Sequence, residues 1–315
     1  MRLSLLRPLF YVCLFLFGSH LIAQKPITLE AIWQKGTFNA KGVPGFNFQR
    51  DGVHFTRLNS GIIEQYDLRS GDKSGVLFDA ATPVATADPA WKSKFDGYTF
   101  SADESKFLLA TNTEQIYRWS SKSDYFVFEQ KSQAITRLHN GPKQRYATFS
   151  PDGSKVAFVV ENDLYYRDLA AGKTIRVTTD GRTNAIINGA SDWVYEEEFE
   201  LIRAFEWSPD GRHLAFLRFD ESEVPEFTME RYQNEAYPVL DTFKYPKVGE
   251  KNAVVTAWLY DLSSAKTQRV DTQAANQNQA ANDPGDYYVP RLAWSPAGQF
   301  CLTVMNRHQN QEHLL

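Results

Sequence analysis

Cysteine is almost absent from the sequence: its 315 residues include only Cys13 and Cys301. Cys13 lies in an N-terminal segment that we expect to be cleaved, so no disulfide can form within the mature chain. Cys301 stands between Phe300 and Leu302, where we expect it to be a small buried hydrophobe. The six histidines are scattered and form no Cys/His cluster with metal-ligand spacing. These absences predict no structural metal and no cofactor.

Concentrated positive charge is also missing. The 34 Lys and Arg are outnumbered by 38 Asp and Glu, which gives a net charge of −4. No basic block or basic amphipathic helix is present, so the sequence predicts neither a nucleic-acid partner nor attachment to a membrane surface.

No apolar run is long enough to span a bilayer. The longest, residues 9–17, follows Arg2 and Arg7, and a small residue, Ala23, then precedes Gln24. This order is typical of a secretory signal peptide, which we place at residues 1–23. An uncleaved anchor is the alternative. The remaining chain, residues 24–315, is expected in the periplasm or outside the cell, with no membrane contact after cleavage.

A short turn-and-strand unit recurs along the chain. Proline presets the first corner of a turn, Asp favours the next, and Gly takes the left-handed position before an apolar strand begins. The clear copies are residues 150–153, 208–211 and 295–298, and weaker copies are residues 101–104 and 50–52. After the first clear copy, further strands are expected at residues 164–168 and 174–178, joined by a hairpin turn at Ala171 and Gly172. About four strands per unit predict an all-β fold, a β-propeller with about five blades.

Three stretches interrupt this repeat. Residues 196–205 have helical composition, which predicts a short helical insertion. Residues 220–252, rich in Pro and Tyr, predict an extended arm with enough apolar side chains to pack on a partner. Residues 272–286 form a Gln/Asn/Ala-rich loop to which no chemistry is assigned.

The helical insertion carries three adjacent carboxylates, Glu196 to Glu198, directly behind the aromatic residues Trp193 and Tyr195. Like charges side by side repel one another, so such a run is tolerated in water or opposite a cation. A solvated acidic face is the simpler interpretation. Because apolar residues bracket the run, its backbone should pack on a core, and carboxylates at the edge of an apolar wall can bind an ammonium group.

At these residues the chain resembles the dipeptidyl peptidase IV family of prolyl-specific serine exopeptidases. The resemblance extends from about residue 27 to the end of the sequence. It is densest in residues 188–199, which include Asp-Trp-Val-Tyr-Glu-Glu-Glu, in residues 219–225 (Phe-Asp-Glu-Ser-Glu-Val-Pro), and in Tyr-Pro-Lys at residues 245–247. The resemblance implies an eight-bladed propeller stacked on a C-terminal α/β-hydrolase domain.

The same resemblance implies roles for particular residues. Glu197 and Glu198 would bind the free N-terminal ammonium of a peptide substrate, which leaves Glu196 a structural role. Arg118, in Tyr-Arg-Trp-Ser, would orient the peptide carbonyl, and Phe199 is expected to line the pocket for the N-terminal side chain by proximity. The arm from Tyr237 to Asn252 would correspond to the family's dimerisation extension, which implies a homodimer. The implied reaction of the family is release of Xaa-Pro or Xaa-Ala dipeptides from free N-termini.

The nucleophile of that reaction is missing. No serine among the 315 residues lies in Gly-x-Ser-x-Gly, and no strand–helix alternation predicts a hydrolase sheet. We therefore interpret the chain as an incomplete N-terminal propeller without the hydrolase domain, without catalytic residues and without peptidase activity of its own. Three alternatives remain open: a shorter closed ring, a non-catalytic propeller that binds peptides or proteins, and a structural β repeat whose acidic run is merely solvated.

Overall fold

A computed structural model describes residues 27–232, 234–272 and 287–315. The expected signal peptide, and the Gln/Asn/Ala-rich loop apart from Thr272, lie outside the described residues. The chain divides into two compact units, residues 1–45 and 46–315. The described part of the smaller unit contains a π-helical turn, η1 (Glu30–Gln34), in which Lys35 N–H donates to the Glu30 carbonyl at 2.9 Å.

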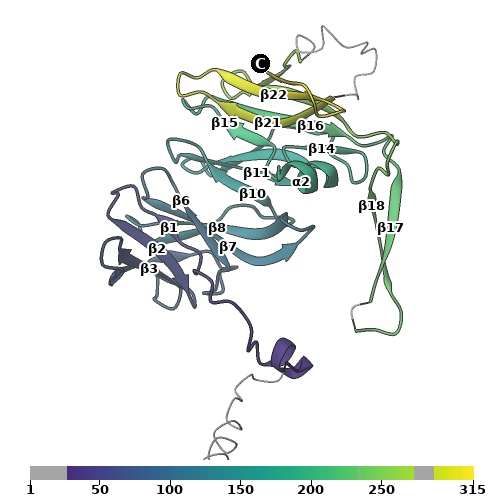
Figure 1. The fold of residues 1–315 in the computed structure, drawn as a ribbon. Coiled ribbons are helices and arrows are strands. Elements are labelled where there is room, and N and C mark those ends of the chain that lie inside the picture. Colours follow the sequence, from purple (N-terminus) through teal and green to yellow (C-terminus); the bar gives the residue numbers. More distant parts are fainter. Residues whose placement is uncertain (1–26, 233, 273–286) are drawn as a thin grey trace, which may run out of the picture. The chain divides into compact units, whose positions relative to one another are not determined.

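The larger unit consists of successive, mainly antiparallel sheets (Figure 1). The first sheet contains β1 (Asn47–Phe48), β2 (His54–Asn59), β3 (Ile62–Asp67) and β4 (Lys73–Asp79). The second contains β5 (Thr86–Ala87), β6 (Gly97–Phe100), β7 (Lys106–Gln115), β8 (Ser121–Glu129) and β9 (Ala134–Arg137). The third contains β10 (Arg145–Phe149), β11 (Lys155–Val160), β12 (Asp163–Asp168) and β13 (Lys173–Arg176).

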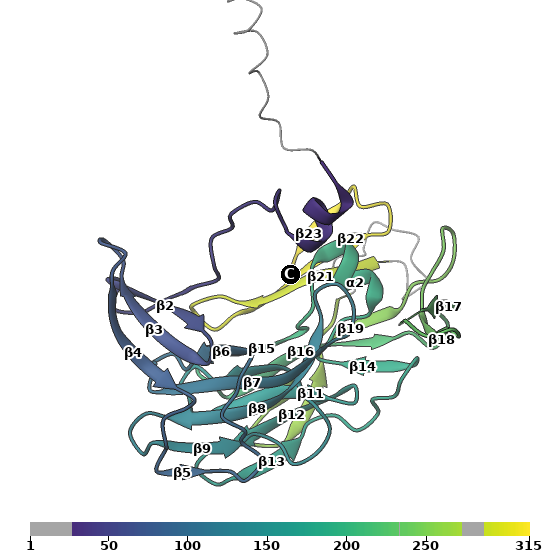
Figure 2. The same cartoon turned by 90° about the horizontal axis from the view of Figure 1, so that it is seen from below.

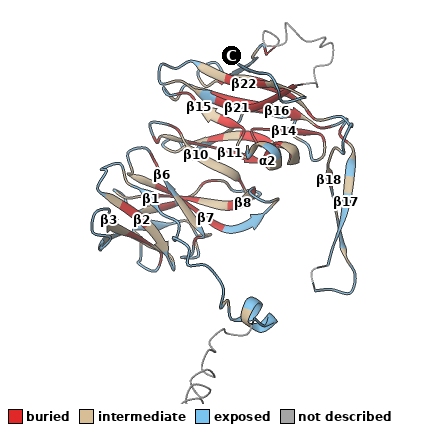
Figure 3. Ribbon diagram, viewed as in Figure 1, coloured by how far each residue is buried: buried red, intermediate tan, exposed pale blue. Residues whose placement is uncertain are grey.

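Two more sheets and a separate hairpin follow. The fourth sheet contains β14 (Ile186–Asn188), β15 (Phe205–Trp207), β16 (His213–Asp220), β19 (Val254–Asp261) and β20 (Lys266–Arg269). The fifth contains β21 (Tyr287–Trp294), β22 (Phe300–Asn306) and β23 (Glu312–Leu314). Between β16 and β19 the chain leaves the fourth sheet as a hairpin of β17 (Glu226–Arg231) and β18 (Val239–Lys244), which is the predicted arm. Figure 3 shows the arm strands largely exposed, whereas the buried residues lie in strands of the blades, such as β11 and β16.

The recurring turns lie where the sequence predicts them, each directly before a long strand. In the turn before β11, Ser150 Oγ donates to Asp152 Oδ1 at 2.5 Å and accepts from Lys155 N–H at 2.9 Å. Gly153 has a φ of 64°, the left-handed conformation that glycine adopts without strain. Ser208 and Asp210 repeat this geometry before β16. The Ser and Asp side chains therefore satisfy backbone donors that the tight turn would otherwise expose.

Neighbouring sheets lie next to one another in sequence order (Figure 2), and apolar side chains pack between them. One core cluster joins the first two sheets, with Phe78 and Phe128 ring centroids 4.6 Å apart. A second joins Leu108 and Val127 to Val156 and Phe158 of the third sheet. A third, larger cluster joins the third, fourth and fifth sheets. Small twisted antiparallel sheets stacked in sequence order are the blades of a β-propeller, so the predicted all-β fold and its five blades are confirmed.

Two local predictions need correction. The helix predicted at residues 196–205 is α2 (Trp193–Phe199), because Glu200 takes a left-handed conformation (φ 53°) that ends the helix before the chain turns into β15. Cys301 is half-buried rather than buried, since it alternates with the buried Leu302 along β22.

Candidate substrate-binding site

The residues directly before helix α2, which carries the glutamate triplet, determine where the helix begins. Asp192 is in an extended conformation, and its Oδ1 accepts the Tyr195 N–H at 2.9 Å, as an N-cap should. Before it, Gly189 has a φ of 75°, and a Cβ there would lie 3.2 Å from Leu164 and Val159 carbons. A side chain at this bend would be strained by the positive φ and would crowd both neighbours.

Core contacts fix the helix in place. Tyr195 is 1% exposed, its ring packs on Phe219 at 4.8 Å, and its hydroxyl accepts the Val289 N–H from β21 at 2.9 Å. Arg291 donates to the Phe199 carbonyl at 2.8 Å at the other end of α2. A helix of seven residues is not stable alone, so these contacts with the fourth and fifth blades stabilise it.

The three glutamates are not equivalent, because successive residues of an α-helix point about 100° apart. Glu196 is turned inward and is 1% exposed. The side chain of Glu197 is 16% exposed, and Glu198 is exposed. The expected repulsion within the run is thus reduced by the helix itself, which separates the three carboxylates.

Glu197 meets Arg118 across the blades. Arg118 lies in the loop between β7 and β8, and its Nε is 3.1 Å from Glu197 Oε2. The Arg118 side chain remains 66% exposed, so its guanidinium has further donors that face solvent. The structure therefore brings together two residues that are 79 positions apart (197 − 118) and were predicted to share one site.

A cavity of about 900 Å³ opens beside Glu198. Helix α2 contributes Trp193 and Phe199 to its wall, the arm contributes Phe227 and Phe243, and the following segment contributes Tyr245, whose ring contacts Trp193 at 4.5 Å. Lys247 and Arg307 add positive charge to this largely aromatic lining. A carboxylate at the edge of an aromatic hollow can bind an amine and exclude water around it.

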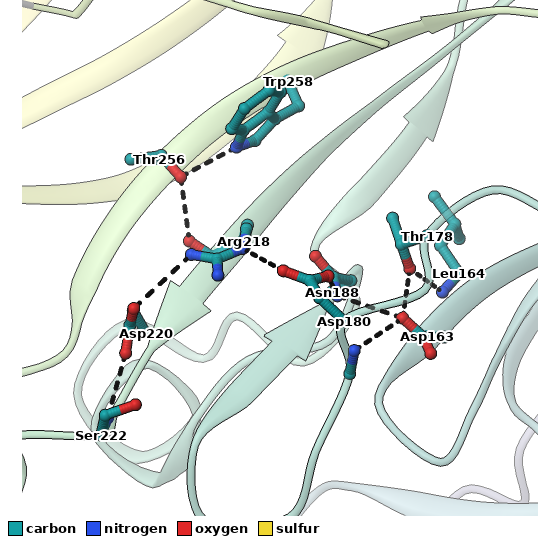
Figure 4. A network of polar contacts seen from close by, with 11 residues as sticks. Asp163, Leu164, Thr178, Asp180, Asn188, Arg218, Asp220, Ser222, Thr256 and Trp258 are labelled. Atoms are coloured by element: carbon teal, nitrogen blue, oxygen red, sulfur yellow. Dashed lines mark hydrogen bonds and ion pairs between the residues drawn. The ribbon is translucent and has the colours of Figure 1, made fainter. Parts of the chain in front are cut away.

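A polar network supports the start of the glutamate segment (Figure 4). Asn188, the last residue of β14, donates from Nδ2 to Asp180 at 2.9 Å and to Asp163 at 3.3 Å. Asp163 also accepts from the Thr178 hydroxyl at 2.6 Å, and Arg218 donates to Asp180 at 2.8 Å. The network connects the third and fourth blades at Asn188, the residue directly before the bend at Gly189.

Two buried carboxyls at or near α2, those of Asp192 and Glu221, have raised pKa values. Burial raises the pKa of Asp192 to about 6, although the Tyr195 N–H favours its charged form. Burial, with the charge of Asp192, raises the pKa of Glu221 to about 7, against the opposing effect of Lys244 and Arg145. Both groups therefore hold protons more tightly in the folded chain than in an unfolded one.

Sequence reasoning placed Glu197, Glu198, Phe199 and Arg118 in one site. In the structure the first three lie on α2, and Arg118 contacts Glu197 from the loop between β7 and β8. Phe199 lines the cavity, while its ring also packs on Tyr288 at 5.2 Å. Sequence reasoning missed the Tyr195 hydroxyl and the Glu221 carboxyl, whose roles depend on burial. Asp192 could have been found, because an Asp directly before a helix is a typical N-cap.

Comparison with known proteins shows the family and the fold of the chain. The model of the dipeptidyl peptidase IV (DPP IV) N-terminal region matches residues 101–315. Dipeptidyl peptidase 4 of Trichophyton rubrum is 34% identical over 272 residues, which are 82% of this chain and 34% of that protein. Prolyl endopeptidase FAP of Homo sapiens is 28% identical over 312 residues, 96% of this chain and 39% of that protein. The crystal structure of Porphyromonas gingivalis dipeptidyl peptidase 4 superimposes with a TM-score of 0.81 at 34% identity, covering 93% of this chain and 40% of that one.

The fold and the matches together define the class of the chain, a β-propeller of the kind found in dipeptidyl peptidases. The chain belongs to the dipeptidyl peptidase IV family and corresponds to its N-terminal propeller portion. It spans less than half the length of each of these relatives. In the described ranges of the chain, no helix is long and apolar enough to cross a membrane.

Proposed function

We propose that the chain is the propeller portion of an exported serine-type dipeptidyl aminopeptidase that releases Xaa-Pro or Xaa-Ala dipeptides from free N-termini. Its part is to bind the substrate's N-terminal ammonium through Glu197 and Glu198, while Arg118 binds the first peptide carbonyl and Phe199 lines the adjoining pocket. The observation that carries this proposal is the Glu197–Arg118 pair at 3.1 Å beside the Glu198 cavity. Names of the relatives, which include dipeptidyl peptidase 4, support the reaction class.

The physical reason for exopeptidase specificity lies in the charge of one end of the substrate. An ammonium held by two carboxylates gains charge-assisted hydrogen bonds of about 1.5–3 kcal/mol each. A blocked or internal amide offers no such charge and would collide with the aromatic wall. The carboxylates therefore fix the register of the peptide relative to the hydrolase domain that we propose completes the enzyme.

Two further parts of the proposal concern export and assembly. Residues 1–23 act as a signal peptide that directs the protein to the periplasm or the outside. The arm from Tyr237 to Asn252 contributes to a homodimer, and its exposed apolar side chains support this: Tyr237 is 85% exposed and Leu240 is 64% exposed. The first arm strand, β17, precedes that range and pairs with β18 along its full length.

Calorimetric titration of the purified chain with an Xaa-Pro tripeptide tests the binding role. Replacing both residues (Glu197→Gln and Glu198→Gln) should weaken binding by about tenfold or more. Glu223→Gln, which removes one exposed carboxylate of the two that the double variant removes, should leave it unchanged. Equal affinity of the wild-type and doubly substituted chains would reject the amine site. It would favour the alternative, a propeller that binds a partner elsewhere.

A further inference from the structure

The first glutamate of the triplet makes a contact that neither of the others makes. Glu196 Oε1 accepts two consecutive backbone N–H groups, from Trp119 at 2.7 Å and from Ser120 at 2.9 Å. Both donors lie in the loop between β7 and β8, on another blade. Two successive amides aimed at one oxygen form a concave anion site, and here a carboxylate from α2 fills it.

This contact connects the loop to α2, while the ring of Tyr117 in the same loop packs on Phe243 of the arm with ring centroids 5.8 Å apart. Within the loop, Ile116 N–H donates to the Ser120 carbonyl at 2.8 Å, and Tyr117 N–H donates to Ser120 Oγ at 3.2 Å. These bonds close the loop on itself and do not connect it to α2. The Arg118–Glu197 ion pair does connect the two elements, but an ion pair whose arginine is 66% exposed contributes little.

Burial makes the Glu196 contact strong. The residue is 1% exposed, and a carboxylate shielded from water requires donors that compensate its charge. Charge-assisted hydrogen bonds to backbone N–H groups are roughly twice as strong as neutral ones. The two donors immediately follow Arg118 in sequence, so they fix the backbone at the residue whose side chain reaches Glu197.

We propose that Glu196 is a positioning residue: its carboxylate sets the place of Arg118 relative to Glu197 and Glu198. This inference rests on the proposed function, in which Arg118 receives the peptide carbonyl and the two glutamates receive the ammonium. Those substrate groups both belong to the first residue of the peptide, where only the N–Cα and Cα–C bonds, of about 1.5 Å each, separate the ammonium nitrogen from the carbonyl carbon. A displacement of about 1 Å in the arginine loop would therefore separate the two halves of the site.

The test uses two variants at Glu196 in the full chain. Glu196→Gln keeps an acceptor oxygen without its charge, whereas Glu196→Ala leaves both amides without that acceptor. Glu200→Gln is the matched control, since Glu200 is an exposed residue at the end of the same helix. Hydrogen exchange at the Trp119 and Ser120 amides, measured by NMR on the ligand-free chain, should accelerate about tenfold or more in Glu196→Ala. The acceleration should be smaller in Glu196→Gln and absent in Glu200→Gln.

A double-mutant cycle then connects the loop to the ligand. With an Xaa-Pro tripeptide as probe, Glu196→Ala should weaken binding about as much as Arg118→Ala, and the double variant should be no weaker than Arg118→Ala alone. Partial recovery in Glu196→Gln would separate loss of the acceptor from general damage to the fold. Unchanged amide exchange in Glu196→Ala, or losses that simply add in the double variant, would overturn the positioning role. A wild-type chain that binds no peptide would instead reject the proposed function, and the exchange rates would still decide whether Glu196 holds the loop.

Discussion

The buried carboxyl of Glu221 predicts an unusual dependence of stability on pH. Glu221 is 6% exposed, and its pKa is about 7 compared with 4.5 for an ordinary glutamate. Since the folded chain holds this proton more tightly than the unfolded chain, its contribution to stability is fully present below about pH 4.5 and is lost as the pH rises through about 7. Asp192 acts in the same direction, with a folded pKa of about 6.

Replacing Glu221 with Gln should remove this loss. A tenfold change in proton affinity corresponds to about 1.4 kcal/mol, so raising the pKa from 4.5 to about 7 corresponds to roughly 3 kcal/mol. The free energy of unfolding of Glu221→Gln, relative to wild type, should therefore rise by up to about 3 kcal/mol between about pH 4 and about pH 8. Gln is nearly isosteric and never ionises, so packing should change little.

Urea unfolding followed by tryptophan fluorescence across this pH range measures the effect. Glu223→Gln is the control, because its side chain is 76% exposed and lies only two residues away. The control should show no comparable trend, since exposed ion pairs contribute little. If the difference between Glu221→Gln and wild type stays constant from acid to alkaline pH, the burial argument is wrong.

Three further predictions follow from local geometry. Gly189→Ala should lower the free energy of unfolding by about 1–3 kcal/mol, because φ is 75° and the added methyl would crowd Leu164 and Val159. Gly52→Ala is the control for crowding, because Gly52 also has a positive φ (71°) but lies in open space. Equal losses of stability in the two variants would contradict the crowding argument. Ser208→Ala should lower the free energy of unfolding in urea by about 1–2 kcal/mol, because the His213 N–H loses its acceptor. Ser263→Ala, at an exposed serine, should lower it by less, and the reverse order would refute the argument about the turn. The purified 315-residue chain should release no chromophore from a Gly-Pro substrate, because none of its serines lies in Gly-x-Ser-x-Gly, and any release of chromophore by the chain would contradict this prediction.

Much of the fold could be predicted because it depends on local chemistry. The turns at residues 150–153 and 208–211 combine Pro, Asp and Gly at positions that each residue prefers by itself, and the strands after them follow from their apolar runs. The end of α2 was predicted wrongly, because Leu201 and Phe205 continue a helical spacing that the left-handed Glu200 interrupts. Packing decides that boundary, since the residues after Glu200 must enter β15 of the fourth blade.

The site was predictable only in part. The choice of Glu197, Glu198 and Arg118 comes from the resemblance to the family and stays a prediction, whereas the partner of Glu196 is a backbone loop 77 residues earlier in the sequence. No local pattern predicts such a contact, because it arises when two blades are stacked. Likewise, Glu221 reads as an ordinary acidic residue until the fold buries it beside Asp192.

The most direct measurement of the central claim is the affinity of the wild-type chain for one Xaa-Pro tripeptide with a free N-terminus and with an acetylated one. Two carboxylates that bind an ammonium predict that acetylation weakens binding by about tenfold or more, and that Glu197→Gln plus Glu198→Gln abolishes this preference. Equal affinity for the two peptides would contradict the account. It would leave Glu197 and Glu198 without a role in binding the amine.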